Sequence, residues 1–144
     1  MKKFKFTLHS LLNVKLSLEK QQKTELAAAQ VRKEGFVREL AAMETRLAEQ
    51  RAAHGAQGGP PVSPFDLAAR GIGFRALFDR MEEQREKIRV AEAERVRIQM
   101  KLTDTMGERK MLEKLKNKQL EQYREEARRE EAVAMDDYLS NQLS

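Results

Sequence analysis

The hydrophobic and polar positions from Leu8 onward repeat with helical spacing. Alternating steps of four and three residues reach a set of positions whose later half is mostly apolar: Leu8, Leu12, Lys15, Glu19, Gln22, Leu26, Ala29, Lys33, Phe36, Leu40, Met43 and Leu47. Side chains at this spacing share one face of a helix, as in the seam of a coiled coil. The pattern predicts a first helix over about residues 8–53. Because the seam is polar between Lys15 and Gln22, we expect the pairing there to be loose or exposed.

A second helical pattern covers the rest of the chain and predicts a helix over about residues 64–137, with short frayed chain ends. Its seam comprises Met81, Ile88, Ala91, Ile98, Leu102, Leu112, Tyr123 and Val133. Glycines at 71, 73 and 107 soften this helix, because glycine is about 1 kcal/mol less favourable than alanine in a helix interior. Arg95 and Arg109 occupy seam positions, and we expect their long stems to carry the charged groups out to water.

Helix-breaking residues gather between the two patterns, where residues 52–66 read AAHGAQGGPPVSPFD. Glycine accepts the left-handed geometry that closes helices, and proline prevents a helix from resuming. The sequence after the breakers starts a new helix, because serine is a favoured N-cap and proline is favoured at the first helical position. We therefore predict that Gly55, Gly58 and Gly59 end the first helix, that Pro60 and Pro61 keep it closed, and that Ser63, Pro64 and Asp66 begin the second.

These elements predict an all-α fold in which two long helices form an antiparallel coiled-coil hairpin, with helix two longer than helix one. A short connection makes consecutive helices antiparallel neighbours. We expect residues 1–144 to form a single helical hairpin with its tip at residues 55–63. If paired positions are equidistant from the tip, residue 8 lies opposite residue 110, and the end of helix two extends beyond helix one.

Composition supports long helices over a compact globule. Charged residues make up 35% of the 144 residues and aromatic residues only 6%. Such a composition is also found in disordered chains, and the helical periodicity decides between the two. The sequence has no cysteine, which excludes disulfides and thiolate metal sites. It shows no signal peptide and no segment of the ~20 apolar residues that span a bilayer, so we expect a cytoplasmic protein.

The formal net charge of +5 is unevenly distributed along the chain. Residues 1–23 contain six basic and one acidic side chain, and residues 85–118 contain eleven basic and six acidic. Residues 119–144 contain three basic and seven acidic side chains, a net charge of −4. The end of helix two is therefore an acidic segment.

Candidate catalytic chemistry is sparse. The only histidines are His9 and His54, and the glycine-containing stretches lack the Lys-Ser/Thr ending of a P-loop. Asp136 and Asp137 are adjacent but have no further carboxylates to complete a metal site. A two-helix rod also offers no obvious concave pocket. We expect a protein that is not an enzyme and that has no cofactor and no metal.

Nucleic-acid binding is the alternative that the basic start of the chain raises. Lys2, Lys3 and Lys5 alternate with Phe4 and Phe6, a combination that could hold phosphates and stack on bases. Acidic residues, however, are interspersed along most of both helices, as on a solvated coiled-coil exterior. No continuous basic helix precedes a heptad zipper. We therefore expect no nucleic-acid partner.

The two ends of the chain resemble a known family. The start MKKFKFTLHSLLNVKLSLEKQQ combines an aromatic alternation with leucines on an opening helix. It resembles the N-terminal signature of FliJ, the small flagellar type III export protein. Residues 112–143, LEKLKNKQLEQYREEARREEAVAMDDYLSNQL, are similar to that family's C-terminal stretch. The chain length and the two-helix plan also match, so the resemblance covers nearly the whole chain.

This resemblance implies a function in flagellum biogenesis, motility and chemotaxis. FliJ proteins are antiparallel helical hairpins that resemble the central stalk of rotary ATPases. They engage the hexameric export ATPase through the end carrying both termini, and they bind the cytoplasmic region of the membrane export gate and export chaperones. The resemblance thus implies a non-enzymatic stalk that is monomeric when free, cytoplasmic, and peripherally associated with the inner face of the cell membrane without inserting into it.

The resemblance also implies two sets of contact residues. We expect the export gate to contact an apolar group early in helix two: Phe74, Leu77, Phe78 and Met81. The glycines of RGIGF depart from the family pattern here. Packing against helix one is the alternative for these residues, and Met81 fits the seam. Phe74, Leu77 and Phe78 together span more than a narrow stripe, however, which favours a partner surface. We expect the ATPase to contact residues near both termini: Phe4, Phe6, Leu8, Gln119, Tyr123, Met135, Asp136 and Asp137.

The sequence is also compatible with two other functions. One is the equivalent ATPase stalk of a virulence type III secretion system. The other is a generic coiled-coil scaffold or a nucleic-acid-binding protein.

Overall fold

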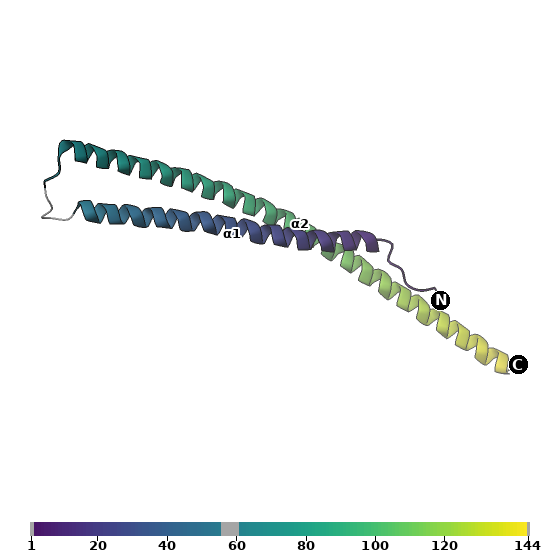
Figure 1. Ribbon diagram of the computed structural model, residues 1–144. Helices are drawn as coiled ribbons and strands as arrows, with labels where there is room; N and C mark the ends of the chain where they lie inside the picture. The colour runs from purple at the N-terminus through teal and green to yellow at the C-terminus, as the bar shows by residue number, and fades with distance from the viewer. Residues whose placement is uncertain (1, 56–60, 144) are drawn as a thin grey trace. The chain divides into compact units, whose positions relative to one another are not determined.

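The computed structural model describes residues 2–55 and 61–143, and this part of the chain is all-helical. Helix α1 spans His9–His54 and helix α2 spans Pro64–Leu143, with 46 and 80 residues (Figure 1). No strand occurs among the described residues. The predicted all-α fold with two helices, of which the second is longer, is confirmed.

The ends of the helices follow from local chemistry. Ser63 caps α2 as predicted, because its Oγ accepts a hydrogen bond of 3.1 Å from the backbone N–H of Asp66. The N–H of Gly55 donates to the carbonyl of Arg51 at 2.8 Å and closes α1. The other predicted breakers of the first helix, Gly58, Gly59 and Pro60, lie outside the described residues. Helix α2 continues past the expected end near residue 137, since no glycine or proline follows residue 107.

Contacts divide the chain into two compact units, residues 24–99 and residues 1–23 with 100–144. In the first unit the helices are antiparallel neighbours. Leu47 near the end of α1 packs with Leu77 and Met81 near the start of α2. Lys33, earlier in α1, forms an ion pair of 2.7 Å with Glu92, later in α2.

The core of this first unit is the predicted coiled-coil seam. Its buried apolar side chains are Ala29, Leu47, Leu77, Met81, Ala91 and Ile98. One polar side chain joins them: Gln84 is buried and donates hydrogen bonds of 2.9 Å to the carbonyl of Phe36 and to Glu39 Oε2. These two bonds satisfy the buried amide nitrogen and fix the register of the two helices.

The second unit pairs the start of α1 with the second half of α2. Its buried apolar side chains are Phe6, Leu12 and Leu102. Glu19, Gln22 and Thr105 are buried between them. The expectation of a loose or exposed pairing around Lys15–Gln22 is therefore wrong. Glu19 is buried there because Arg109 of α2 supplies the opposite charge.

All twelve positions of the first seam are buried or half-buried, which confirms that seam. In the second seam Met81, Ala91, Ile98 and Leu102 are buried, whereas Val133 is exposed and its assignment is wrong. Val133 lies among residues 128–143, which are all exposed. No residue of α1 remains to cover them.

The predicted pairing of residue 8 with residue 110 is also wrong. Glu19 pairs with Arg109, and Phe4 contacts Tyr123. Leu47 likewise faces Leu77 and Met81, further along α2 than an equidistant count allows. The count assumed that both helices stop at the same level, but the first turns of α2 project beyond the last turn of α1. Residues 61–69 are accordingly all exposed.

Candidate interaction sites

The N-terminal segment is fastened to α2 by aromatic side chains. The rings of Phe4 and Tyr123 lie 5.5 Å apart at an interplanar angle of 55°. Tyr123 Oη donates a hydrogen bond of 2.6 Å to the carbonyl of Lys2. Phe6 is buried, and a shallow depression between Phe4, Phe6, His9 and Lys116 lies beside it. The seven described residues before α1, residues 2–8, are thus held against α2 without regular secondary structure.

The residues expected to contact the ATPase fall into two groups. Phe4, Phe6 and Tyr123 belong to the aromatic attachment, and Leu8 and Gln119 are half-buried in the same unit. Met135, Asp136 and Asp137 lie on the exposed end of α2, with Met135 59% exposed. The structure therefore brings the N-terminal residues together with Tyr123 and leaves the last three apart from them.

The exposed end of α2, residues 128–143, is an amphipathic helix that we call the acidic tail. Side chains three and four residues apart share a helix face, which groups the apolar residues Ala132, Met135, Tyr138, Leu139 and Leu143. Residues 128–143 contain four carboxylates and two arginines, and both arginines stand at the start of the tail, so that residues 130–143 have no lysine or arginine. The tail thus combines an unpartnered apolar face with negative charge, a combination that the composition alone did not reveal.

The residues expected to contact the gate are divided by the structure. Leu77 and Met81 are only 6% and 3% exposed, and they form a core cluster with Leu47. Phe74 packs partly against that cluster, and Phe78 is 44% exposed. The expectation that Leu77 belongs to an exposed surface is wrong, because its side chain points toward α1. Packing against helix one, the alternative considered for this group, describes Leu77 and Met81.

The two phenylalanines of this group make contacts with the last turn of α1. The ring of Phe74 lies 5.7 Å from that of His54 in an edge-to-face arrangement. The guanidinium of Arg51 lies 5.8 Å from the centroid of Phe78, a cation–π contact. His54 therefore has a packing role.

Sequence reasoning missed an apolar surface at the start of α2. Phe65, Leu67 and Ile72 are largely exposed there, with Phe65 81% exposed. Phe65 and Ile72 are seven residues apart and share a face with Ala69 and Ala76. The signal was present in the sequence as apolar residues outside the seam positions.

An ion pair between the buried Glu19 and the half-buried Arg109 forms the polar layer of the seam. Arg109 contacts both oxygens of Glu19, with Nη2 3.4 Å from Oε1, and also donates to Glu113 at 2.9 Å. Lys23 lies 3.2 Å from Glu19. Burial raises the pKa of Glu19, but the hydrogen bonds from Arg109 and Lys23 outweigh it and hold that pKa below its usual value. The expectation that Arg109 carries its charge out to water is wrong, since Arg109 ends in these ion pairs.

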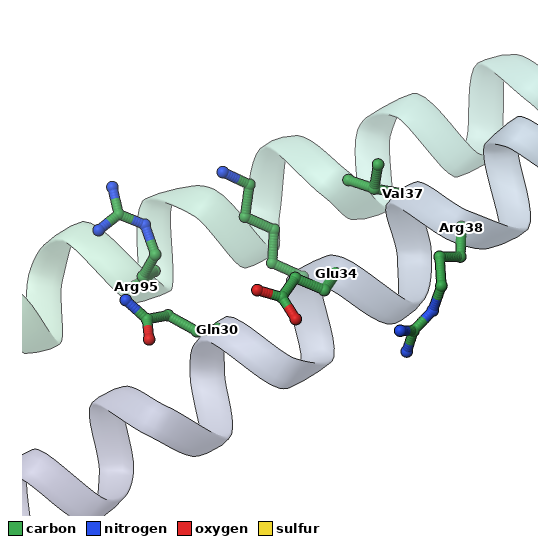
Figure 2. A pocket seen from close by; sticks show the side chains of 6 residues that line it. Gln30, Glu34, Val37, Arg38 and Arg95 are labelled. Atoms are coloured by element: carbon green, nitrogen blue, oxygen red, sulfur yellow. The ribbon is translucent and has the colours of Figure 1, made fainter.

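A second ionic group lies across the hairpin at Glu92. Its carboxylate accepts hydrogen bonds of 2.6 and 2.8 Å from Arg95. It also forms an ion pair with Lys33, with 2.7 Å between Lys33 Nζ and Glu92 Oε2. The hydrogen bonds from Arg95 and Lys33 lower the pKa of Glu92 to about 2. Lys33 and Arg95 also line a shallow groove, for which Figure 2 shows Gln30, Glu34, Val37 and Arg38 projecting from α1 and Arg95 from α2.

Within residues 2–55 and 61–143 no three His, Cys, Asp or Glu side chains are placed to hold a metal ion. Among the same residues, neither α1 nor α2 contains an apolar segment long enough to cross a membrane. The sites are surfaces of a charged two-helix coiled coil, and such surfaces are suited to binding other proteins.

Comparison with known proteins identifies the family. The model of the family described as "Flagellar FliJ protein" matches residues 4–144. The chain therefore belongs to the FliJ family and is a protein related to flagellar type III export. No curated protein and no solved structure shows a significant match to it.

Proposed function

We propose that this protein is a non-enzymatic stalk of the flagellar export apparatus. In this proposal it engages the hexameric export ATPase, links it to the membrane export gate and to export chaperones, and associates peripherally with the membrane. The free chain is a monomer in dilute solution, because each unit completes its own core. Membership of the FliJ family supports the export setting.

The main support for the proposed ATPase contact is the exposed apolar face of the acidic tail. Residues 128–143 are exposed throughout and present an apolar face that no described part of the chain covers. An uncovered apolar face of this kind marks an interaction site. Phe4, Phe6 and Tyr123 hold the N-terminal segment at the base of the tail. The tail enters the ring in this proposal, and the aromatic attachment orients it.

Truncation before residue 128 tests this proposal. The truncated chain keeps the Phe4–Tyr123 contact and the hydrogen bond to Lys2, so it folds as the full chain does. We expect it to lose stimulation of ATP hydrolysis by the purified export ATPase. Circular dichroism checks that the remaining helices form. Full stimulation by the truncated chain would overturn the proposed contact.

For the gate we propose a surface made of the exposed side chains early in α2. Phe78 and the half-buried Phe74 remain from the expected set, and Phe65 and Ile72 extend the apolar surface. Leu77 and Met81 support it from the core. Exposed aromatic anchors commonly dominate the binding energy of protein interfaces.

A further inference from the structure

A second groove between α1 and α2 lies in the unit formed by residues 24–99. Its floor is apolar, with the half-buried Phe36 from α1 and with Val90 and Ala91 from α2. Val90 is 55% exposed. The side chains of this floor belong to the outer margin of the seam, so a further helix laid along the groove would cover them.

The walls of this groove carry two unpaired cations. Arg32 projects from α1 and Lys87 from α2, and neither forms an ion pair among the residues that the structure describes. The two carboxylates at the same groove are already neutralised within α2. Glu86 is held by Arg89 at 2.5 and 2.9 Å, and Glu94 is held by Arg97. The groove is therefore apolar at its floor and positive at both walls.

The positions of the two cations indicate where a helix bound in the groove would need its carboxylates. The pairing of Lys33 with Glu92 and of Phe36 with Gln84 sets the register of the hairpin. By this register Lys87 lies nearer the loop than Arg32, by about one helical turn of ~5 Å. A helix in the groove would meet one cation on each side, at different heights. It needs an apolar stripe flanked on both sides by carboxylates.

The acidic tail has this arrangement. Its apolar stripe is centred on Met135 and Leu139, which are 59% and 49% exposed. At 100° per residue, Glu131 and Asp136 fall on opposite sides of that stripe, and they are about 7–8 Å apart along the axis. Neither carboxylate forms an ion pair within residues 2–55 and 61–143. The tail and the groove are thus complementary in apolar surface and in charge.

We propose that the acidic tail of one copy of this protein docks in the Arg32–Lys87 groove of a second copy. In this proposal the contact is intermolecular, and a tail docked within its own chain would instead leave the mass independent of concentration. Exchange of tails between two copies closes a dimer, whereas docking in one direction builds a chain. The monomer is the dilute limit of this equilibrium, and the inference does not rest on the proposed ATPase contact.

Sedimentation of the full chain over a range of concentrations tests the inference. We expect the average mass to rise with concentration at low salt and to fall when salt is added, since screening weakens charge pairs at a surface. Replacing both groove cations, in the variant R32E/K87E, should weaken association by at least about tenfold, because like charges then face each other. The tail variant E131K/D136K should lose association to a similar degree.

Combining the four substitutions provides the decisive control. The variant R32E/K87E/E131K/D136K exchanges the signs of both partners and should associate as the natural chain does. The variant R46E/K101E changes the net charge as much as R32E/K87E does, but at two exposed cations outside the groove, and should associate normally. Circular dichroism establishes that each variant is folded. A mass independent of concentration, equal losses in R32E/K87E and R46E/K101E, or no recovery in the fourfold variant would each overturn the inference.

Discussion

Single side chains decide which of the apolar residues early in α2 are available to a partner. Leu77 and Met81 are buried against Leu47, whereas Phe78 keeps nearly half of its surface exposed and is contacted by Arg51. All of them are large and apolar, and they lie within two helical turns. Their difference in exposure separates a role in stability from a role in binding.

The variants L77A and F78A test this separation. We expect L77A to lower the free energy of unfolding by about 2–5 kcal/mol, because it leaves a cavity in the core. We expect F78A to change the free energy of unfolding by less than about 1 kcal/mol while weakening binding to the cytoplasmic domain of the gate. Thermal unfolding and a binding titration on the same two variants measure both effects. Unchanged gate affinity in F78A would remove Phe78 from the proposed surface.

Glu92 gives the hairpin a pH dependence. Its pKa is lowered from the usual 4.5 to about 2 by the hydrogen bonds from Arg95 and Lys33. Because the folded-state pKa is below the unfolded one, the ionised carboxylate stabilises the fold fully above about pH 4.5. That contribution is lost as the pH falls from about 4.5 through about 2.

We therefore expect the variant E92Q to reduce the loss of stability on acidification. Melting temperatures measured from pH 6 down to pH 2 should fall less steeply in E92Q than in the natural chain. The matched control is E44Q, since Glu44 is exposed and has no ion pair among the described residues. A slope in E92Q equal to that in E44Q would contradict this role of Glu92.

At the scale of an element, the seam between α1 and α2 contains a polar layer in which opposite charges from the two helices pair. Glu19 is buried, its partner Arg109 is half-buried, and the buried Gln22 has an unpaired Oε1. Removing one member of a buried ion pair leaves the other charge without compensation, whereas replacing both with apolar residues is often neutral or stabilising. The layer therefore adds little net stability, and it favours the one register that aligns its charges.

A pair of variants tests this interpretation of the seam. We expect R109L alone to lower the melting temperature, since Glu19 then stays buried with only Lys23 beside it. The double variant E19L/R109L should melt at or above the temperature of the natural chain. Differential scanning calorimetry on the three proteins compares them directly. A double variant that melts below the natural chain would show that the ion pair is itself a net source of stability.

At the scale of the whole molecule, stability is distributed unevenly along α2. Residues near the seam of either unit bury apolar surface, whereas residues 128–143 are exposed throughout. Helices with no packed face are marginal in water, because most helical stability in proteins comes from tertiary contacts. The acidic tail is the longer of two parts of α2 that lack such contacts in the free chain, and residues 64–69 are the other.

Hydrogen exchange measures this distribution. In dilute solution we expect amides of residues 128–143 to exchange fast, and those around Met81, Ala91 and Ile98 to exchange slowly. Addition of the export ATPase should slow exchange in the tail if the tail enters the ring. Protection of the tail equal to that of the core, in the dilute free chain, would show that the tail is packed and not exposed.

Local sequence determined the two helices and most of the side chains with which they pack against each other. The four-and-three spacing from Leu8 to Leu47 placed every position of the first seam correctly, because helical periodicity depends only on neighbours in the chain. Ser63 was recognisable as an N-cap for the same reason, since its partner Asp66 is three residues away. The ends of the chain also carried the resemblance to the FliJ family.

Tertiary structure decided what depends on residues far apart in sequence. The pairing of Glu19 with Arg109, the burial of Leu77 and the contact of Phe4 with Tyr123 each require the register between α1 and α2. Counting from the loop could not supply that register, because the first turns of α2 project beyond α1. The charge of Glu19 in the seam predicted a loose pairing from the sequence, but Glu19 is buried because Arg109 of the opposite helix forms an ion pair with it. Burial and pairing are properties of two helices together, and the pattern of one helix does not contain them.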